Sequence, residues 1–316
     1  MRRVVILFGS LAVLAVAAWP EAAARQGAKR RPAVEATRTD ARNRFVGTWK
    51  LVAIERFGPN GELLPAPAPP AFGSPNPTGV LVYDAAGYMG MTMMQSGRQK
   101  FAGAQPTPDE VKTALLSYTS DCGTFSVNDA DRVVTHHVQT SLNPNYASTD
   151  ERSGFQFSGT RLVLNPSRSV DGTRARVTWE RVPDVTPSTP VHRRLIGFWK
   201  YYTREWRTLD GQLVRTDPPS PGFVIFSAAG YLATCVASGS YGSYFGRYEV
   251  NEKESYEVTR TIGSVNPAEV GQLALRYVAF AGDRAVLKPV PDIFNGQLVQ
   301  RYNIFDRVSP PPGSTQ

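Results

Sequence analysis

The segment Phe45-Val46-Gly47-Thr48-Trp49-Lys50 returns 150 residues later as Leu195-Ile196-Gly197-Phe198-Trp199-Lys200. A second segment, Tyr83-Asp84-Ala85-Ala86-Gly87-Tyr88, returns 143 residues later as Phe226-Ser227-Ala228-Ala229-Gly230-Tyr231. A third offset, of 123 residues, holds without a gap from residue 118 to residue 164. Because the matches keep their order and the offset changes only in loops, the chain contains two copies of one unit.

Each copy has the local pattern of short antiparallel strands joined by tight turns. In the first copy, three hairpins are predicted, with their turns at Ala85-Gly87, Asn128-Asp131 and Ser158-Gly159. With an opening strand at Trp49 and a closing strand at Trp179, each copy has about eight strands, which fit a closed up-and-down barrel. The predicted fold is therefore all-β, with two tandem eight-stranded antiparallel barrels at residues 45–182 and 195–308.

The segments around the barrels have other compositions. Residues 1–24 combine Arg2 and Arg3, an apolar run and a small-residue cleavage site, so we expect a signal peptide and a periplasmic or secreted protein. Residues 25–44 are expected to be a disordered basic tether with weak membrane-surface contact as one role. Residues 183–194 are expected to be a stiff linker and residues 309–316 a disordered tail. The longer first copy is also expected to hold a short helix from Asp109 to Leu116, capped near Thr107.

The net charge of +8 argues against a nucleic-acid partner once it is located along the chain. Residues 25–44 hold seven basic and two acidic side chains, which is +5, and residues 1–24 contribute +1. Only +2 remains for everything after Arg44, so the sequence does not indicate the basic groove that a nucleic-acid backbone requires.

At these residues the chain resembles the lipocalin-like domain family of bacteria and fungi, present twice. The resemblance rests on matching motifs in the first copy: Gly47-Thr48-Trp49, Gly79 with Tyr83, Gly87-Tyr88, His136-His137-Val138, Asn143-Pro144, Gly159 and Trp179-Glu180-Arg181-Val182. It implies a lipocalin-type barrel in each copy, in which an Arg of the last strand covers the indole of the opening Gly-x-Trp. The structural residues that this resemblance implies are Gly47, Trp49 and Arg181 in copy one and Gly197, Trp199 and Arg307 in copy two.

The candidate ligand-binding residues lie in copy one. They are His136, His137, Tyr83, Tyr118, Arg152 and Met91. His136 and His137 are adjacent on a strand and must point to opposite faces, so one of them can anchor a ligand or act as a base. Phenols such as Tyr244 in copy two are further pocket candidates, and the family's Arg is better placed there, at Arg276. The run Met89 to Met94 either adapts to ligands or fills gaps in the core.

These residues favour an exported protein that binds a small apolar or amphipathic molecule in a barrel cavity. Two alternatives stay open: a cyclase- or isomerase-like enzyme that uses a His of barrel 1, and a structural module with filled barrels. The partner is expected to be a small hydrophobic molecule, with no cofactor and no metal. Export would permit a disulfide between Cys122 and Cys235, but Phe245 and Thr92 replace them in the other copy, which favours two buried free thiols.

Overall fold

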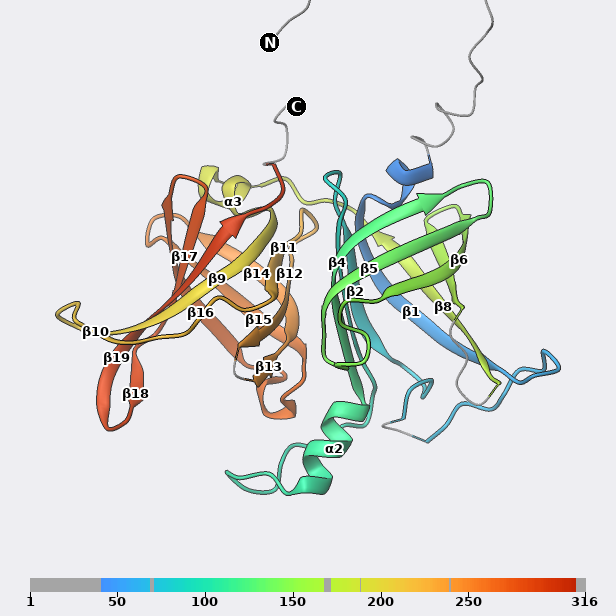
Figure 1. The fold of residues 1–316 in the computed structure, drawn as a ribbon, viewed down its shortest axis with the longest axis horizontal. Helices are drawn as coiled ribbons and strands as arrows, with labels where there is room; N and C mark the ends of the chain where they lie inside the picture. Colours follow the sequence, from blue (N-terminus) through green and yellow to red (C-terminus); the bar gives the residue numbers. More distant parts are fainter. Residues whose placement is uncertain (1–40, 69–70, 168–171, 188, 239, 311–316) are drawn as a thin grey trace, which may run out of the picture.

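Two β-barrels stand side by side in the computed structural model (Figure 1). The structure describes residues 41–68, 71–167, 172–187, 189–238 and 240–310. The signal peptide expected at 1–24, the tether up to residue 40 and the tail from residue 311 lie outside the described residues. Residues 41–45, at the end of the expected tether, are helical, and Ser309 is buried.

Barrel 1 closes through pairing of its first and last strands. Its strands are β1 (Gly47–Phe57), β2 (Thr78–Tyr83), β3 (Tyr88–Met94), β4 (Tyr118–Asn128), β5 (Val133–Ser141), β6 (Asp150–Ser158), β7 (Arg161–Pro166) and β8 (Arg174–Val182). Each strand pairs antiparallel with the next, as the hairpin patterns predicted. The helix α2 (Pro108–Leu116) leaves this barrel between β3 and β4, and Thr107 caps it as predicted.

Barrel 2 closes in the same way, through pairing of β9 with β19. Its eight barrel strands are β9 (Gly197–Thr208), β11 (Gly222–Phe226), β12 (Tyr231–Ser238), β14 (Tyr244–Asn251), β15 (Tyr256–Ser264), β16 (Leu273–Ala281), β17 (Arg284–Pro289) and β19 (Gln297–Arg307). Short extra strands and helical turns extend it: β10 (Leu213–Thr216), β13 (Ser240–Gly242), β18 (Asp292–Phe294), α3 (Pro190–Leu195) and η1 (Pro267–Glu269). Because α3 begins at Pro190, the end of the expected linker is helical. The prediction of two closed eight-stranded barrels is confirmed.

The two copies share a β-bulge that only glycine permits. The bulge follows Cys122 on β4 and Phe245 on β14, and the next residues are Gly123 and Gly246. A Cβ on Gly123 would lie 2.0 Å from the carbonyl oxygen of His137, and one on Gly246 would lie 2.1 Å from an equivalent carbonyl. Since these are backbone atoms that cannot move aside, the close approach of the strands depends on the missing side chain.

An arginine covers the opening tryptophan of each barrel. The Arg181 guanidinium lies 4.3 Å from the Trp49 ring centre, and that of Arg307 lies 4.1 Å from Trp199. Arg181 also donates to the carbonyl oxygen of Val46 at 2.8 Å, which satisfies backbone before the first strand. The stacked guanidinium thus combines cation–π attraction with capping of the closed end.

The barrels pack through strands that are buried on both faces. On β2, Leu81 faces the interior of barrel 1, while Val80 and Val82 face barrel 2. On β11 of barrel 2, Phe223 and Ile225 face barrel 1. Equivalent strands therefore meet, and Ser243 donates to its own counterpart Ser120 across the contact at 2.8 Å. This arrangement is the self-complementary contact of a twofold dimer, made within one chain.

A disulfide joins Cys122 of β4 to Cys235 of β12 across this interface. The prediction of two free thiols is therefore wrong. Both residues are fully buried, and they occupy different positions of the repeat, so neither copy alone shows a reason for sulfur. Only the docking of the barrels brings the two strands together.

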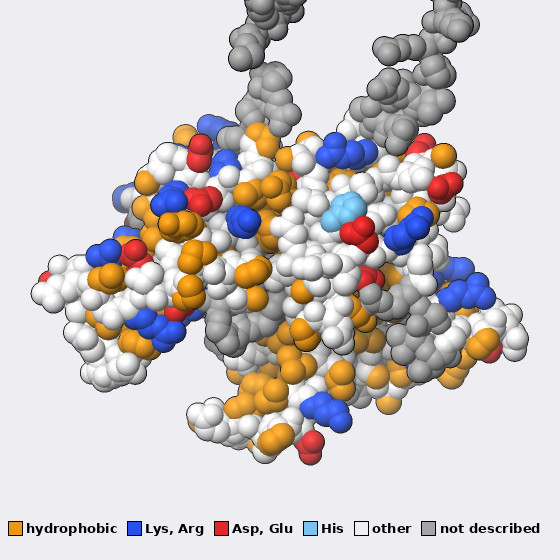
Figure 2. Space-filling model, viewed as in Figure 1, with side chains coloured by type: hydrophobic (Ala, Val, Ile, Leu, Met, Phe, Trp, Pro, Cys, Tyr) orange, Lys and Arg blue, Asp and Glu red, His pale blue; other side chains and the backbone are white. Residues whose placement is uncertain are grey.

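Arg98, just before α2, makes a second link between the barrels. Its guanidinium donates to the carbonyl oxygens of Ser264 and Val265 in barrel 2 and to that of Ala114 in α2. The helix still exposes apolar side chains, and Figure 2 shows hydrophobic atoms gathered over α2 at the lower edge of the molecule. Through Arg98, barrel 1 holds the β15–β16 connection of barrel 2 in place.

Candidate functional site

The interior of barrel 1 is filled by its own side chains. Its core residues include Phe45, Trp49, Leu51, Leu81, Tyr83, Met89, Met93, Phe125, Val134, Phe155, Leu162, Leu164, Val177 and Trp179. Phe45 enters from the helical turn before β1 and packs edge-on against the rings of Tyr83 and Phe155. Met89, Met91 and Met93 share the inner face of β3, as alternation predicted, and they pack in this core.

Tyr83 and His136 form a closed pair inside this core. The Tyr83 hydroxyl lies 2.6 Å from Nε2 of His136, and both side chains are buried. Burial raises the pKa of Tyr83 well above its usual value, while burial and, to a smaller extent, neighbouring His137 lower the pKa of His136 to about 4. His136 is therefore a neutral core histidine whose hydrogen bond is already used.

The other candidates of copy one do not gather around a common space. His137 points outward as alternation requires, and it binds Ser126 and Asp150 at the surface. Arg152 is exposed on β6. Tyr118 lies in the interface, where its hydroxyl contacts Ser243 at 3.1 Å, and Met91 packs against the core of barrel 1.

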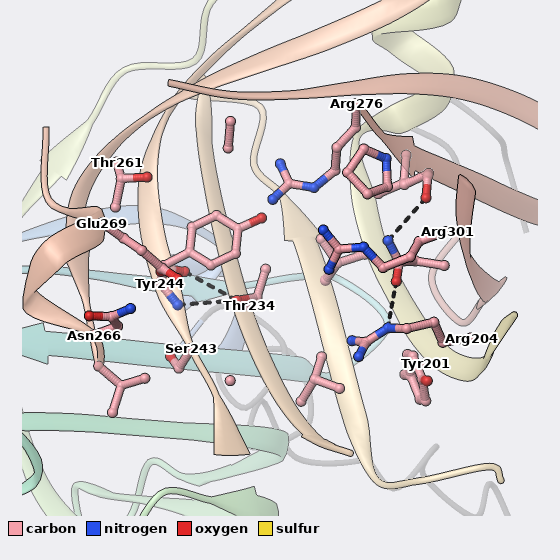
Figure 3. A pocket seen from close by; sticks show the side chains of 18 of the residues that line it. Tyr201, Arg204, Thr234, Ser243, Tyr244, Thr261, Asn266, Glu269, Arg276 and Arg301 are labelled. Carbon is pink, nitrogen blue, oxygen red and sulfur yellow. Dashed lines mark hydrogen bonds between the residues drawn. The ribbon is translucent and has the colours of Figure 1, made fainter. Parts of the chain in front are cut away.

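Barrel 2 contains a cavity of about 550 Å³ (Figure 3). Val224, Leu287 and Phe305 line its inner end, where it meets the apolar core of the barrel. Leu273 and Pro289 line it nearer the strand ends. Its volume falls within the range of about 300–1,000 Å³ that small-molecule pockets occupy.

A buried ion pair forms part of the cavity wall. Arg276 of β16 lines the cavity and donates to Oε1 of Glu257 on β15 at 2.9 Å, and Thr259 donates to the other carboxylate oxygen at 2.8 Å. Glu257 is fully buried, and burial raises its pKa although both donors lower it. Breaking such a pair on one side costs about 3–5 kcal/mol, so the pair holds Arg276 firmly in position.

The equivalent positions of barrel 1 are apolar or small. Arg276 and Glu257 face each other across β16 and β15, just as Ser153 and Val134 do across β6 and β5. The offset of 123 residues relates the two pairs. Barrel 2 thus carries a charged pair where barrel 1 fills its core.

A second exchange of the same kind lies on β9 and β19. Arg204 of β9 lines the cavity, and its Nε donates to Oδ1 of Asn303 on β19 at 2.9 Å. In barrel 1 the corresponding cross-strand pair is Ile54 with Val177, both packed in the core. Two uncharged pairs of barrel 1 thus correspond in barrel 2 to polar pairs whose arginines line an open space.

Arg301 and Tyr244 also belong to the polar part of the lining. Arg301 binds Asp292 at 2.8 Å through one terminal nitrogen, whereas its Nε is buried and has no hydrogen-bond partner among the described residues. The Tyr244 ring lies 5.2 Å from the Arg276 guanidinium, and burial raises the pKa of its hydroxyl. The cavity therefore offers guanidinium donors beside apolar surface.

Copy one was predicted to hold the site because its two histidines offer acid–base and ligand chemistry. Arg276 and Tyr244 were noticed in copy two, but Arg204, Arg301, Asn303 and Glu257 were missed. The signal was present in the repeat: once the copies are aligned, inward positions that are apolar in one copy carry charge in the other.

Comparison with known proteins agrees with this geometry. Residues 46–182 match the family described as the lipocalin-like domain. Barrel 1 is a lipocalin-like domain. The match covers all of β1 to β8, and the closed second barrel with the same Trp–Arg contact shows that the lipocalin-like fold is present in tandem.

The more distant comparisons add little to the lipocalin-like assignment. No curated protein matches the chain. A solved structure of a protein of unknown function from the DUF3598 family of Nostoc punctiforme is 11% identical, covers 86% of this chain and 99% of its own, and has a TM-score of 0.25. Transferrin binding protein B of Haemophilus parasuis is 7% identical over 84% of this chain and 77% of its own, with a TM-score of 0.22. Neither likeness bears on function at these scores.

Two further classes of feature were sought in the part of the chain that the structure describes. None of its helices combines the length and the apolar character that crossing a bilayer requires. Within the same residues, no three or more His, Cys, Asp or Glu side chains are grouped so that they could hold a metal ion.

Proposed function

We propose that this protein binds a small amphipathic molecule in the cavity of barrel 2. The observation that carries the proposal is that uncharged wall positions of barrel 1 are replaced by the pairs Arg276–Glu257 and Arg204–Asn303 around an open space in barrel 2. Burying charged groups beside a cavity is costly unless they serve a ligand or a fixed structure. Apolar surface at the inner end of the same cavity supports a ligand with an apolar part.

A structural role for barrel 1 follows from its filled core. Its contribution to binding is to brace barrel 2: Arg98 holds the Ser264 and Val265 carbonyls, and Val265 lines the cavity. Ser243, also in the lining, is held by Tyr118 and Ser120 of barrel 1. The proposal therefore moves the ligand site away from His136 and His137, and it assigns no catalytic step.

The apolar run and cleavage site of residues 1–24 support a periplasmic or secreted location for this binding protein. The buried disulfide fits the same proposal, because disulfides persist in oxidising compartments. The basic segment 25–44 would then add weak contact with an anionic membrane surface.

The test is titration of the full chain with N-phenyl-1-naphthylamine, a neutral apolar probe whose fluorescence rises in dry pockets. Ala274 lines the cavity from β16, so Ala274→Trp places an indole inside it. Tyr277→Trp on the same strand is the matched control, because Tyr277 is exposed on the outer face. We expect the wild type and Tyr277→Trp to bind the probe and Ala274→Trp, checked for folding by circular dichroism, to lose it. Absence of binding by the wild type, or equal binding by both variants, would overturn the proposal.

A further inference from the structure

Three arginines from three strands point into the barrel 2 cavity. Arg276 comes from β16, Arg301 from β19 and Arg204 from β9, and Figure 3 shows all three on one side, facing Tyr244 and Glu269. Taking the proposed function as its basis, we propose that the ligand carries an anionic group, a carboxylate or a phosphate, which binds among these guanidinium groups.

The carboxylates that pair with these arginines leave donors free. Asp217, Glu257 and Asp292 each bind one of the three arginines, at 3.8, 2.9 and 2.8 Å respectively. None of these acids is among the residues that line the cavity. A guanidinium has five N–H donors, and a single carboxylate engages two of them at most. Arg204 uses one further donor on Asn303, and Figure 3 shows the side chains of all three arginines directed into the cavity.

Arg301 has the clearest unmet requirement. Its Nε lies beside the cavity, is buried, and has no hydrogen-bond partner among the described residues. Leaving a buried donor of a charged group unsatisfied destabilises the folded protein. An anion oxygen placed in the cavity would accept this hydrogen bond, and a neutral aliphatic group would not.

Like charges act on Arg301, although Glu257 and Glu269 favour the charged form of neighbouring Arg276. Burial lowers the pKa of Arg301, and the positive charges of Arg204 and Arg276 lower it further, against the opposing effect of Asp292. The lining itself holds three guanidinium groups and one carboxylate, Glu269, which accepts a hydrogen bond from Ser264 on the other wall. An anion between the arginines relieves the repulsion, whereas a cation increases it.

The apolar part of the ligand has its own place. Val224, Leu287 and Phe305 lie at the inner end, and the Tyr244 ring lies against Arg276. A ligand with one anionic group on a short aliphatic or aromatic body satisfies both surfaces. The class is thus an anion-headed amphiphile, with the carboxylate and phosphate forms left for the experiment to separate.

The experiment is displacement of bound N-phenyl-1-naphthylamine from the full chain by ligands with one ten-carbon tail. Decanoate, decyl phosphate, decanol and decyltrimethylammonium are compared below their micelle concentrations. We expect at least one of the two anions to displace the probe at a concentration about tenfold or more below that of decanol, and the cation to be weakest. Sodium acetate and inorganic phosphate test whether an anion without a tail displaces the probe. Displacement by either salt at the concentration that the ten-carbon anions require would assign the subsite to a free anion and overturn the proposal of an amphiphilic ligand.

The arginine variants tie the preference to the site. Arg301→Gln should reduce the anion-to-decanol ratio about tenfold while decanol itself is unchanged, and Arg301→Lys should restore part of the ratio. Arg284→Gln is the control, because Arg284 lies outside the cavity and pairs with Asp306 at the surface. Two results would overturn the proposal of an anionic ligand without overturning the binding function. One is equal displacement by decanol and both anions, and the other is an anion-to-decanol ratio that Arg301→Gln leaves unchanged. Failure of the probe to bind the wild type overturns the proposed function itself.

Discussion

Replacing both cysteines with alanine should show how strongly the two barrels are held together. The Cys122–Cys235 disulfide spans a sequence separation of 113 residues and crosses from one barrel to the other. For a loop of this length, loss of chain entropy in the unfolded state corresponds to about 5 kcal/mol. Both sulfur atoms are buried in the interface, so removing them also costs about 1 kcal/mol in packing.

The assay is urea unfolding followed by tryptophan fluorescence and circular dichroism. We expect Cys122→Ala/Cys235→Ala to lose about 4–6 kcal/mol in the free energy of unfolding and to unfold at a lower urea concentration. Wild-type protein unfolded and refolded in reductant is the control, because it keeps both side chains and lacks only the bond. The free energy of unfolding of oxidised wild type is compared with that of reduced wild type and with that of the alanine variant. A difference below about 1 kcal/mol in both comparisons would refute the reasoning that the bond constrains a long loop.

Three further predictions concern barrel 1 and its closed end. The pKa of His136 falls from 6.5 unfolded to about 4 folded, so its neutral form supports stability above pH 6.5 and that support is lost as the pH falls towards 4. His136→Gln should remove about 3 kcal/mol of pH dependence from urea unfolding between these values, and equal slopes in both proteins would contradict this. Arg181→Met should lower the free energy of unfolding by about 2–3 kcal/mol, with little rescue by Arg181→Lys, since only a guanidinium both stacks and caps; full rescue by lysine would be evidence against this. Gly123→Ala should cost about 2 kcal/mol or more in thermal or urea unfolding because its Cβ meets a backbone carbonyl at 2.0 Å, and a neutral effect would show that the bulge can relax.

The sequence predicted the barrels well because the repeat made weak signals strong. A single Gly-x-Trp motif says little, but the same motif at Trp49 and Trp199, each with an Arg near the end of its copy, fixes where both barrels begin and close. The hairpin turns then required the strands between them to pair in order. Local pattern is sufficient for the hairpins because each depends on neighbouring residues.

The disulfide and the cavity depend on contacts that local pattern does not contain. Cys122 and Cys235 occupy unlike positions of the repeat, and they meet only because β4 and β12 pack across the interface. Whether an interior is open depends on total side-chain volume, which local pattern does not give: side chains fill the core of barrel 1, whereas a cavity of about 550 Å³ remains in barrel 2. The aligned copies do reveal which inward positions carry charge, and that comparison is the route by which the site could have been predicted.

The contact between the barrels also explains how one copy became free to change. Ser120 and Ser243 are equivalent and touch, so each barrel uses the same outer face, as subunits of a twofold dimer do. With barrel 1 filled and rigid against this face, barrel 2 can carry buried charges at its core positions without losing its support. Under the proposed function, the duplication separates a structural barrel from a binding barrel within one chain.

The location of the ligand can be measured directly by crystallography with 10-bromodecanoate. The account predicts a bromine anomalous peak inside barrel 2, beside Val224 and Phe305, with the carboxylate against Arg276 and Arg301. A peak inside barrel 1 or between the barrels, or a barrel 2 cavity that stays empty at saturating ligand, would contradict it.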